Sequence, residues 1–113
     1  MKTETLAGLF KALSEPIRLR IIRLLLAKEE LCVCELVEVL GISQSVISRH
    51  LAYLRNHNIL VSSRSGVWVY YKLTATALTE MNVLLLFIQN NTQSCAGMVD
   101  DLERLEKTKG CAQ

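Results

Sequence analysis

The chain has 113 residues, of which half are hydrophobic and 5% are aromatic, and its formal net charge is +2. A chain of this length predicts a single domain, residues 1–113, with a core that a second subunit could help to complete. No apolar run reaches the roughly 18 residues that a membrane-spanning helix needs, and the N-terminal residues show no signal-peptide pattern. The composition therefore argues against a membrane protein and predicts a soluble, cytoplasmic one.

A helix is expected over residues 6–13, where Leu6, Leu9 and Leu13 recur at helical spacing. Ser14 precedes Glu15-Pro16, and a proline in the first helical position after a serine cap is a start signal, so a second helix should begin at Pro16. Three arginines of this second helix are interpreted as a solvated or phosphate-facing surface: Arg18, Arg20 and Arg23.

Residues 33–56 carry a helix-turn-helix pattern. One helix fits 33–40 and ends at Gly41, and a second fits 44–56 with Ser43 as its cap. A short glycine-containing turn between two helices is typical of the unit whose second helix enters the DNA major groove. The outward positions of that second helix carry hydrogen-bonding groups suited to base edges and phosphates: Gln44, Ser45, Ser48, Arg49 and Tyr53.

The two histidines lie in or just after this second helix, and neither has a ligand-type residue at helical spacing. His50 is interpreted as a DNA-facing group or as an interhelix hydrogen-bonding group. His57 is assigned to the helix C-terminus, where a partial positive charge suits the helix dipole. No carboxylate lies between Glu38 and Glu80, so a polyanion could approach this part of the chain without meeting a fixed negative charge.

Residues 59–73 predict a β-hairpin, because two runs rich in β-formers flank the turn tripeptide Arg64-Ser65-Gly66. A hairpin directly after a recognition helix is the wing of a winged helix. Arg64 should reach the DNA backbone or minor groove, while Trp68 and Tyr70 or Tyr71 should fix the hairpin to the core.

Helical spacing returns at Thr74 and continues to about residue 106. A wide apolar stripe joins Leu78, Met81, Leu84, Leu85 and Ile88. Together with the first helix, it is more apolar surface than so small a domain can cover. The predicted fold is therefore mainly α with a β-hairpin wing, a winged helix-turn-helix that forms a homodimer through its terminal helices, with residues 74–106 assigned to dimerisation.

Three strings together resemble the ArsR/SmtB family of metalloregulatory repressors, close to its arsenite-responsive branch. They are the segment from Leu9 to Leu19, the ELCVCEL string of residues 30–36 and the QSVISRHLAYL string of residues 44–54, followed by the wing. The resemblance covers about residues 6–75. It implies a repressor, not an enzyme, that binds double-stranded operator DNA as an apo dimer and needs no cofactor for repression. It also implies that As(III) or Sb(III), acting as inducer, binds cysteines and releases the DNA.

Cys32 and Cys34 are the candidate metalloid ligands, because thiolates are soft donors that prefer a soft thiophile to hard cations. On an ideal helix, residues two apart point about 200° away from each other, so two-sulfur ligation should compete with the first turn of the reading unit. Where the enteric version of the branch has a third cysteine, this chain has Val37. Cys95 or Cys111 could supply a third sulfur, and two-coordinate binding is the remaining alternative.

Two other functions compete with this interpretation. A thiol-redox-sensing or Cd/Pb-sensing repressor of the same fold would use the same cysteines. A thiol oxidoreductase is disfavoured, because the chain lacks a Cys-x-x-Cys within a βαβ unit and a neighbouring acid or base. The family's other metal site, built from Asp and His on a C-terminal helix, has no counterpart, because residues 74–105 contain no histidine.

Overall fold

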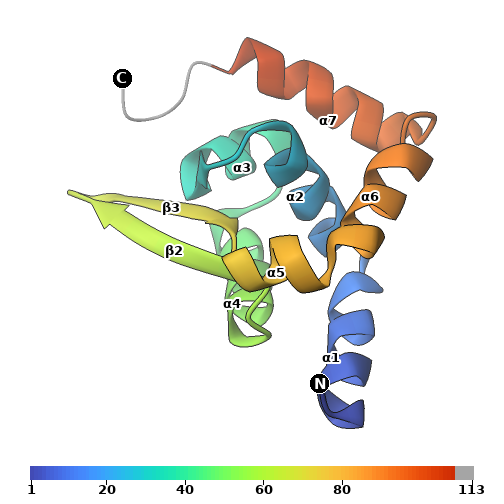
Figure 1. Ribbon diagram of the computed structural model, residues 1–113. Helices are drawn as coiled ribbons and strands as arrows, with labels where there is room; N and C mark the ends of the chain where they lie inside the picture. Colours follow the sequence, from blue (N-terminus) through green and yellow to red (C-terminus); the bar gives the residue numbers. More distant parts are fainter. Residues whose placement is uncertain (109–113) are drawn as a thin grey trace.

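The computed structural model describes residues 1–108, which form a helical body from which a small antiparallel hairpin projects (Figure 1). In chain order the elements are α1 (Thr3–Leu13), α2 (Pro16–Ala27), β1 (Leu31–Cys32), α3 (Val33–Leu40), α4 (Gln44–Asn56), β2 (Leu60–Ser65), β3 (Trp68–Leu73), α5 (Ala75–Glu80), α6 (Asn82–Asn91) and α7 (Ala96–Lys107). In the described part of the chain, every helix is too short or too polar to cross a membrane. Cys111 lies outside the described residues.

The helix-turn-helix follows the sequence prediction to the residue. Helix α3 ends at Gly41, whose φ of 65° is the left-handed conformation that glycine adopts without strain. Helix α4 begins after Ser43, which takes the N-cap position, but its hydroxyl faces that of Ser45 at 3.4 Å and caps no backbone N–H. His57 is the C-cap residue of α4, as expected.

The start of α2 differs from the expectation in one detail. Pro16 is the first helical residue, but the cap is Glu15, whose carboxylate accepts the backbone N–H of Arg18 at 2.9 Å. The Ser14 hydroxyl instead donates to the Lys11 carbonyl at 2.8 Å and helps to end α1. The prediction of a Ser14 cap was therefore wrong, because that hydroxyl is used by the helix before it.

The wing is the hairpin β2–β3, and it carries a third strand that the sequence did not predict. The sheet order is β1-β3-β2 with antiparallel pairing, and β1 pairs Leu31 with Tyr71 and Cys32 with Tyr70. The turn is Gly66-Val67, since Ser65 pairs with Trp68 and Arg64 with Val69 inside the ladder. The positive φ of Gly66 (62°) allows this tight two-residue turn, so Arg64 lies just before the tip rather than in it.

The core lies between α2, α3, α4, the base of the wing and the α5–α6 segment. It is built from aliphatic side chains that are almost completely buried, such as Ile21, Leu36, Ile47, Leu51 and Leu54. Tyr71 joins this core, as predicted for one of the wing aromatics. Three residues of the apolar stripe predicted for dimerisation also belong to it, namely Met81, Leu85 and Ile88. That part of the stripe faces inward, so a partner cannot contact it.

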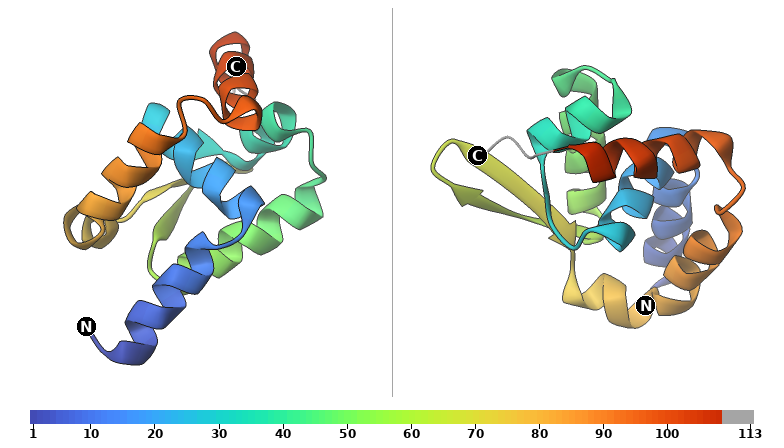
Figure 2. Two further views of the ribbon diagram at one scale, coloured as in Figure 1. Left: turned by 90° about the vertical axis from the view of Figure 1, so that its right-hand side faces the viewer. Right: turned by 90° about the horizontal axis from the view of Figure 1, so that it is seen from above.

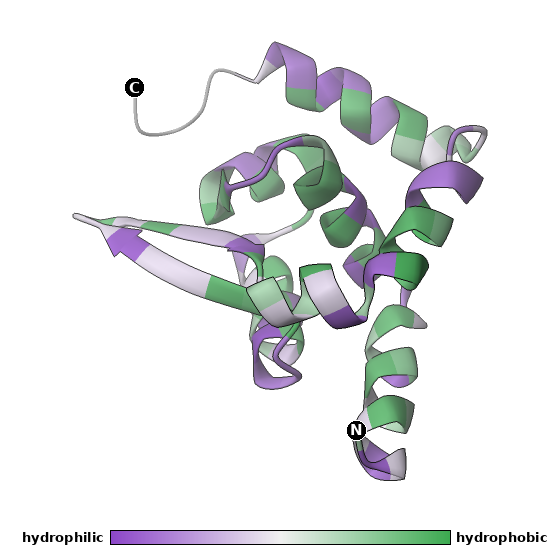
Figure 3. Cartoon of the chain, in the orientation of Figure 1, coloured by the Kyte–Doolittle hydropathy of each residue, from purple (hydrophilic) through white to green (hydrophobic). Residues whose placement is uncertain are grey.

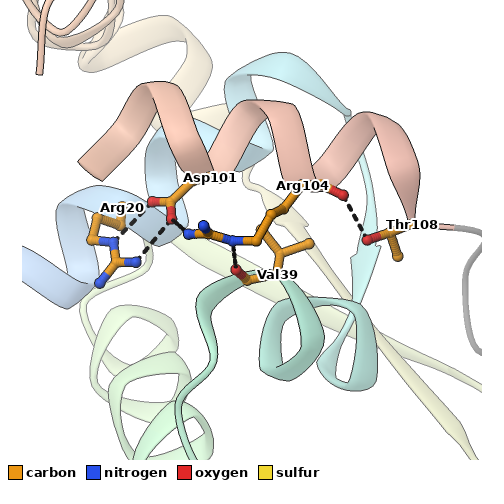
Figure 4. A network of polar contacts seen from close by, with 5 residues as sticks. All are labelled: Arg20, Val39, Asp101, Arg104 and Thr108. Carbon is orange, nitrogen blue, oxygen red and sulfur yellow. Dashed lines mark hydrogen bonds and ion pairs between the residues drawn. The ribbon is translucent and has the colours of Figure 1, made fainter. Parts of the chain in front are cut away.

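Helix α7 lies across α2 and α3, on the far side from α4 (Figures 1 and 2). Its two inward leucines, Leu102 and Leu105, pack against the core. Asp101, only 1% exposed, accepts Nε and Nη2 of Arg20 at 2.8 Å each and Nη2 of Arg104 at 2.7 Å (Figure 4). Arg104 Nε also donates to the Val39 carbonyl at 2.6 Å. This network fastens α7 to both α2 and the last turn of α3.

Candidate functional site

The outer face of α4 is polar and open to solvent. The exposed side chains there are Gln44, Ser45, Ser48 and Arg49. Their spacing places them opposite the buried set of Ile47, Leu51 and Leu54, because each residue turns the helix by about 100°. Arg64 of β2 is exposed as well. The second helix of the helix-turn-helix and the wing thus present hydrogen-bond donors and acceptors on the surface.

His50 and Tyr53 are not part of this outer face. His50 is 8% exposed, and Nη1 of Arg18 lies 3.3 Å from its Nδ1. Tyr53 is half-buried, with the Arg18 guanidinium carbon 4.1 Å above its ring centroid. The outward position predicted for Tyr53 was therefore wrong, because an arginine from α2 covers the ring. For His50 the structure has the interhelix hydrogen bond rather than the DNA-facing position.

The arginines of α2 are partly exposed, but each also bonds to another part of the protein, so they are not the simple solvated or phosphate-facing surface predicted from the sequence. Arg18 contacts α1 and α4, Arg20 binds Asp101, and Arg23 Nε donates to the Thr92 hydroxyl at 3.2 Å. The sequence could not show these partners, because each lies on another element, and two of them are more than sixty residues away along the chain.

Cys32 is almost completely buried, at 1% exposed, and lies at the junction of β1 and α3. It is the N-cap residue of α3: its Sγ accepts the backbone N–H of Glu35 at 3.4 Å, and Glu35 Oε1 accepts the backbone N–H of Cys32 at 3.0 Å. This reciprocal pair is a capping box in which sulfur replaces the usual hydroxyl. The same residue pairs with Tyr70 of β3 through its backbone.

Glu35, which completes this cap, also forms an ion pair. Its carboxylate is 4% exposed, and Oε2 accepts Lys28 Nζ at 2.8 Å. Burial acts to raise the pKa of Glu35, but the hydrogen bonds from Lys28 and from the Cys32 backbone outweigh it and lower the pKa overall. Glu35 is therefore a carboxylate at neutral pH and can hold the Cys32 N–H.

The two candidate cysteine ligands differ in local conformation. Cys32 has extended φ and ψ (−82° and 158°), whereas Cys34 is the second residue of α3 and is half-buried. The sequence argument had placed both within a helical turn, and this was wrong, because pairing with β3 keeps Cys32 extended. Ligation at Cys32 would therefore compete with a helix cap and a strand pairing rather than with an internal helical turn.

A groove of about 580 Å³ connects the cysteines with the exposed face of α4 and the wing. Its walls are Cys32 and Cys34 on one side, Gln44, Ser48 and Arg55 of α4 on another, and the hairpin residues Ser62, Ser63, Arg64, Val67, Trp68, Val69 and Tyr71. The groove brings the candidate metalloid ligands together with three of the predicted DNA-binding residues. This juxtaposition depends on the unpredicted strand β1.

Within residues 1–108, the remaining cysteine, Cys95, does not line this groove. Cys95 is exposed and is the N-cap residue of α7. Among residues 1–108, no three His, Cys, Asp or Glu side chains form a cluster able to hold a metal ion. Cys32 is a free thiol, whereas Cys34 is disulfide-bonded, so ligation of a soft thiophile by this pair requires the reduced protein.

Comparison with known proteins decides the family. Residues 15–62 match the family model "Bacterial regulatory protein, arsR family". Over 102 residues, 89% of this chain and 86% of the relative, the sequence is 41% identical to the arsenic resistance transcriptional regulator ArsR2 of Pseudomonas putida. The chain belongs to the ArsR family. Its predicted family and its winged helix-turn-helix fold are thereby confirmed.

Solved structures agree with this assignment. HlyU from Vibrio cholerae is similar with a TM-score of 0.70 and 32% identity, covering 80% of this chain and 96% of that one. The antimony-specific transcriptional repressor AntR is similar with a TM-score of 0.62 and 28% identity, covering 79% of this chain and 81% of that one. Proteins of this ArsR group are DNA-binding transcriptional regulators, so the chain is a regulator and not an enzyme.

Proposed function

We propose that this ArsR-family protein is a metalloid-responsive repressor that binds operator DNA as an apo homodimer in the cytoplasm. Binding of As(III) or Sb(III) to the thiolates of Cys32 and Cys34 would release the DNA and derepress arsenic-resistance genes. The observation that carries the proposal is the groove in which both cysteines meet the α4 surface and the wing. The names of the similar proteins, an arsenic-resistance regulator and an antimony-specific repressor, support the choice of inducer.

The DNA-contacting residues in this proposal are the exposed polar groups. Gln44, Ser45, Ser48 and Arg49 would meet base edges and phosphates in the major groove, and Arg64 would meet the adjacent backbone or minor groove. His50 and Tyr53 lie on another side of α4, where Arg18 contacts both side chains. They would support the position of α4 rather than touch the DNA.

The cap at Cys32 supplies the coupling between inducer and DNA. A sulfur that is bound to a metalloid no longer accepts the Glu35 N–H in the same way, and the strand pairing with Tyr70 lies on the same residue. Ligation would therefore loosen the first turn of α3 and the inner edge of the wing together. An inducer that prefers the loosened form about 100-fold would shift the equilibrium by roughly 2.7 kcal/mol.

The test is a set of Cys→Ser variants at Cys32, Cys34, Cys95 and Cys111, assayed for arsenite-triggered loss of operator binding under reducing conditions. Cys32→Ser and Cys34→Ser should bind DNA as the parent protein does but keep the complex when arsenite is added, because each lacks one soft donor. A serine hydroxyl can still cap α3. Full induction of both variants would refute the site.

Cys95→Ser and Cys111→Ser test the third-ligand alternatives. Loss of the arsenite response in only one of them would assign that cysteine as a ligand, and retention in both would support two-coordinate binding. Release by peroxide without arsenite, together with no response to arsenite under reducing conditions, would instead favour the redox-sensing alternative. Release by Cd(II) or Pb(II) alone would favour the other metal-sensing alternative.

A further inference from the structure

Arg18 belongs to α2 and contacts both α1 and α4. It is not among the residues proposed to bind DNA or the inducer. Its Nε donates to the Ala12 carbonyl at 2.7 Å and its Nη2 to the Lys11 carbonyl at 3.3 Å, both in the last turn of α1. The last carbonyls of a helix have no partner within the helix. One side chain of α2 therefore fixes the C-terminal end of α1.

The same guanidinium holds α4. Its Nη1 donates to Nδ1 of His50 at 3.3 Å, and its carbon atom lies 4.1 Å above the Tyr53 ring centroid. Tyr53 stacks in turn on His57, with ring centroids 4.5 Å apart and planes inclined by 22°. His50, Tyr53 and His57 follow one another at helical spacing, so the contacts run along one side of α4, away from the exposed DNA-facing side.

The fit between α1 and this stack is tight. A Cβ added to Gly8 of α1 would lie 3.3 Å from Cδ2 of His57, so the absence of a side chain at Gly8 lets the two helices approach. The planar guanidinium is suited to its position, because it stacks on a ring and donates in its plane at the same time. A lysine ammonium in this position could not do both.

We propose that Arg18 is a positioning residue that sets the direction of α4, the DNA-reading helix, by tying it to the end of α1. The surface that reads DNA is then oriented by contacts on the opposite side of the same helix. In a dimer assembled through α1, this tie would also fix the distance between the two reading helices. The proposal concerns DNA reading alone and does not depend on the identity of the inducer.

The experiment measures DNA binding by fluorescence anisotropy for the wild-type protein, Arg18→Met and Arg18→Lys. The specific probe is a duplex selected from random sequences by the wild-type protein, and the non-specific probe is a scrambled duplex. If the wild-type protein enriches no sequence, the proposed repressor function fails before any variant is compared. Arg23→Met is the matched control, because Arg23 lies on the same helix and bonds to Thr92, away from α4.

Arg18→Met should lose specific affinity by a factor on the order of ten, because an α4 that is no longer held in place has to be ordered when it binds DNA. Its non-specific affinity and its salt dependence should stay as in the wild type, since Arg18 touches no phosphate in this proposal. Arg18→Lys should resemble Arg18→Met, because charge alone does not restore the stacked fork. Arg23→Met should bind as the wild type does.

Three results would overturn the proposal. Wild-type specific affinity in Arg18→Met would show that the tie is not needed, and wild-type affinity in Arg18→Lys would show that only charge matters. A salt-dependence slope reduced by about one would identify Arg18 as a phosphate contact. If Arg18→Met does not fold, the ring nitrogen NMR signals of His50 are compared between Arg18→Lys and the wild-type protein. Unchanged signals would refute the contact between Arg18 and His50.

Discussion

The imidazole of His50 lies in surroundings that disfavour its charged form. Burial lowers the pKa of His50 below 6.5, and the neighbouring charges of Arg18 and Arg49 lower it further, while Glu15, 3.8 Å away, acts to raise it. Because Arg18 donates to Nδ1, the neutral ring must carry its proton on Nε2. Protonation would place a second positive charge against the guanidinium.

This arrangement predicts a loss of stability in mild acid. The unfolded chain takes up the proton near pH 6.5, and the folded chain only at lower pH, so the free energy of unfolding falls as the pH drops through and below this value. The His50→Asn variant keeps a hydrogen-bond acceptor but cannot titrate. Its free energy of unfolding should therefore decrease less between pH 7 and pH 5 than that of the wild-type protein. Urea unfolding of both proteins at several pH values measures the difference, and His57 is common to both. Parallel curves would contradict the prediction.

Trp68 offers a direct test of the proposed inducer site. It is the single tryptophan of the chain, and it lines the same groove as Cys32 and Cys34. Arsenite added to the reduced protein without DNA should therefore change the tryptophan emission in a saturable way, because ligation alters the wall next to the indole. Cys32→Ser should abolish this change. Cys95→Ser is the control, because Cys95 lies outside the groove. Emission that never responds to arsenite would place the ligand elsewhere.

At the scale of elements, α7 depends on one buried carboxylate. Asp101 joins Arg20 of α2 to Arg104, which in turn bonds to Val39 of α3 (Figure 4). The side chains of Arg20 and Arg104 are 26% and 47% exposed. If the carboxylate of Asp101 is removed, water can therefore replace part of the hydrogen bonding that the two arginines lose. Among residues 1–108, Asp101 is the carboxylate that both arginines of this network bind, and no second carboxylate takes part in these bonds.

Asp101→Asn should lower the free energy of unfolding by about 2 kcal/mol, less than for a fully buried ion pair because of this exposure. The neighbouring Asp100 is exposed, and Asp100→Asn provides a control of the same charge change on the same helix. Urea denaturation measures both. Equal small effects in the two variants would show that α7 is held by Leu102 and Leu105 alone.

The elements that the sequence predicted best are those with a local signal. Helices α3 and α4 follow from apolar spacing and from Gly41, whose left-handed φ ends α3. Strand β1 was missed because two residues show no period and its pairing partner Tyr70 lies almost forty residues away. The roles of Arg18, Arg20 and Tyr53 were misjudged for the same reason, since their partners belong to distant elements. The capping role of Cys32 had a signal, the glutamate three residues later, but sulfur is an unusual cap.

At the scale of the whole molecule, several exposed large apolar residues belong to α1 and α6. These helices lie on one side of the protein (Figure 1), and both contain hydrophobic residues (Figure 3). Leu6 and Phe10 of α1 are 44% and 51% exposed, and Val83, Leu86 and Phe87 of α6 are 78%, 46% and 64% exposed. We therefore expect these exposed residues, rather than the buried part of the predicted stripe, to contact a second copy of the chain. Large exposed apolar patches of this kind mark interaction sites.

We expect Phe87→Glu to convert a dimer into a monomer, because a charge buried at a subunit interface without a partner is strongly unfavourable. Val61→Glu is the control, since Val61 is a comparably exposed apolar residue, 42%, on the hairpin rather than on α1 or α6. Sedimentation velocity at micromolar concentration gives the mass of each protein. The monomeric variant should also lose specific DNA affinity, because a two-fold site read by two helices needs both copies. A dimer that survives Phe87→Glu but dissociates in Val61→Glu would move the interface from α6 to the wing.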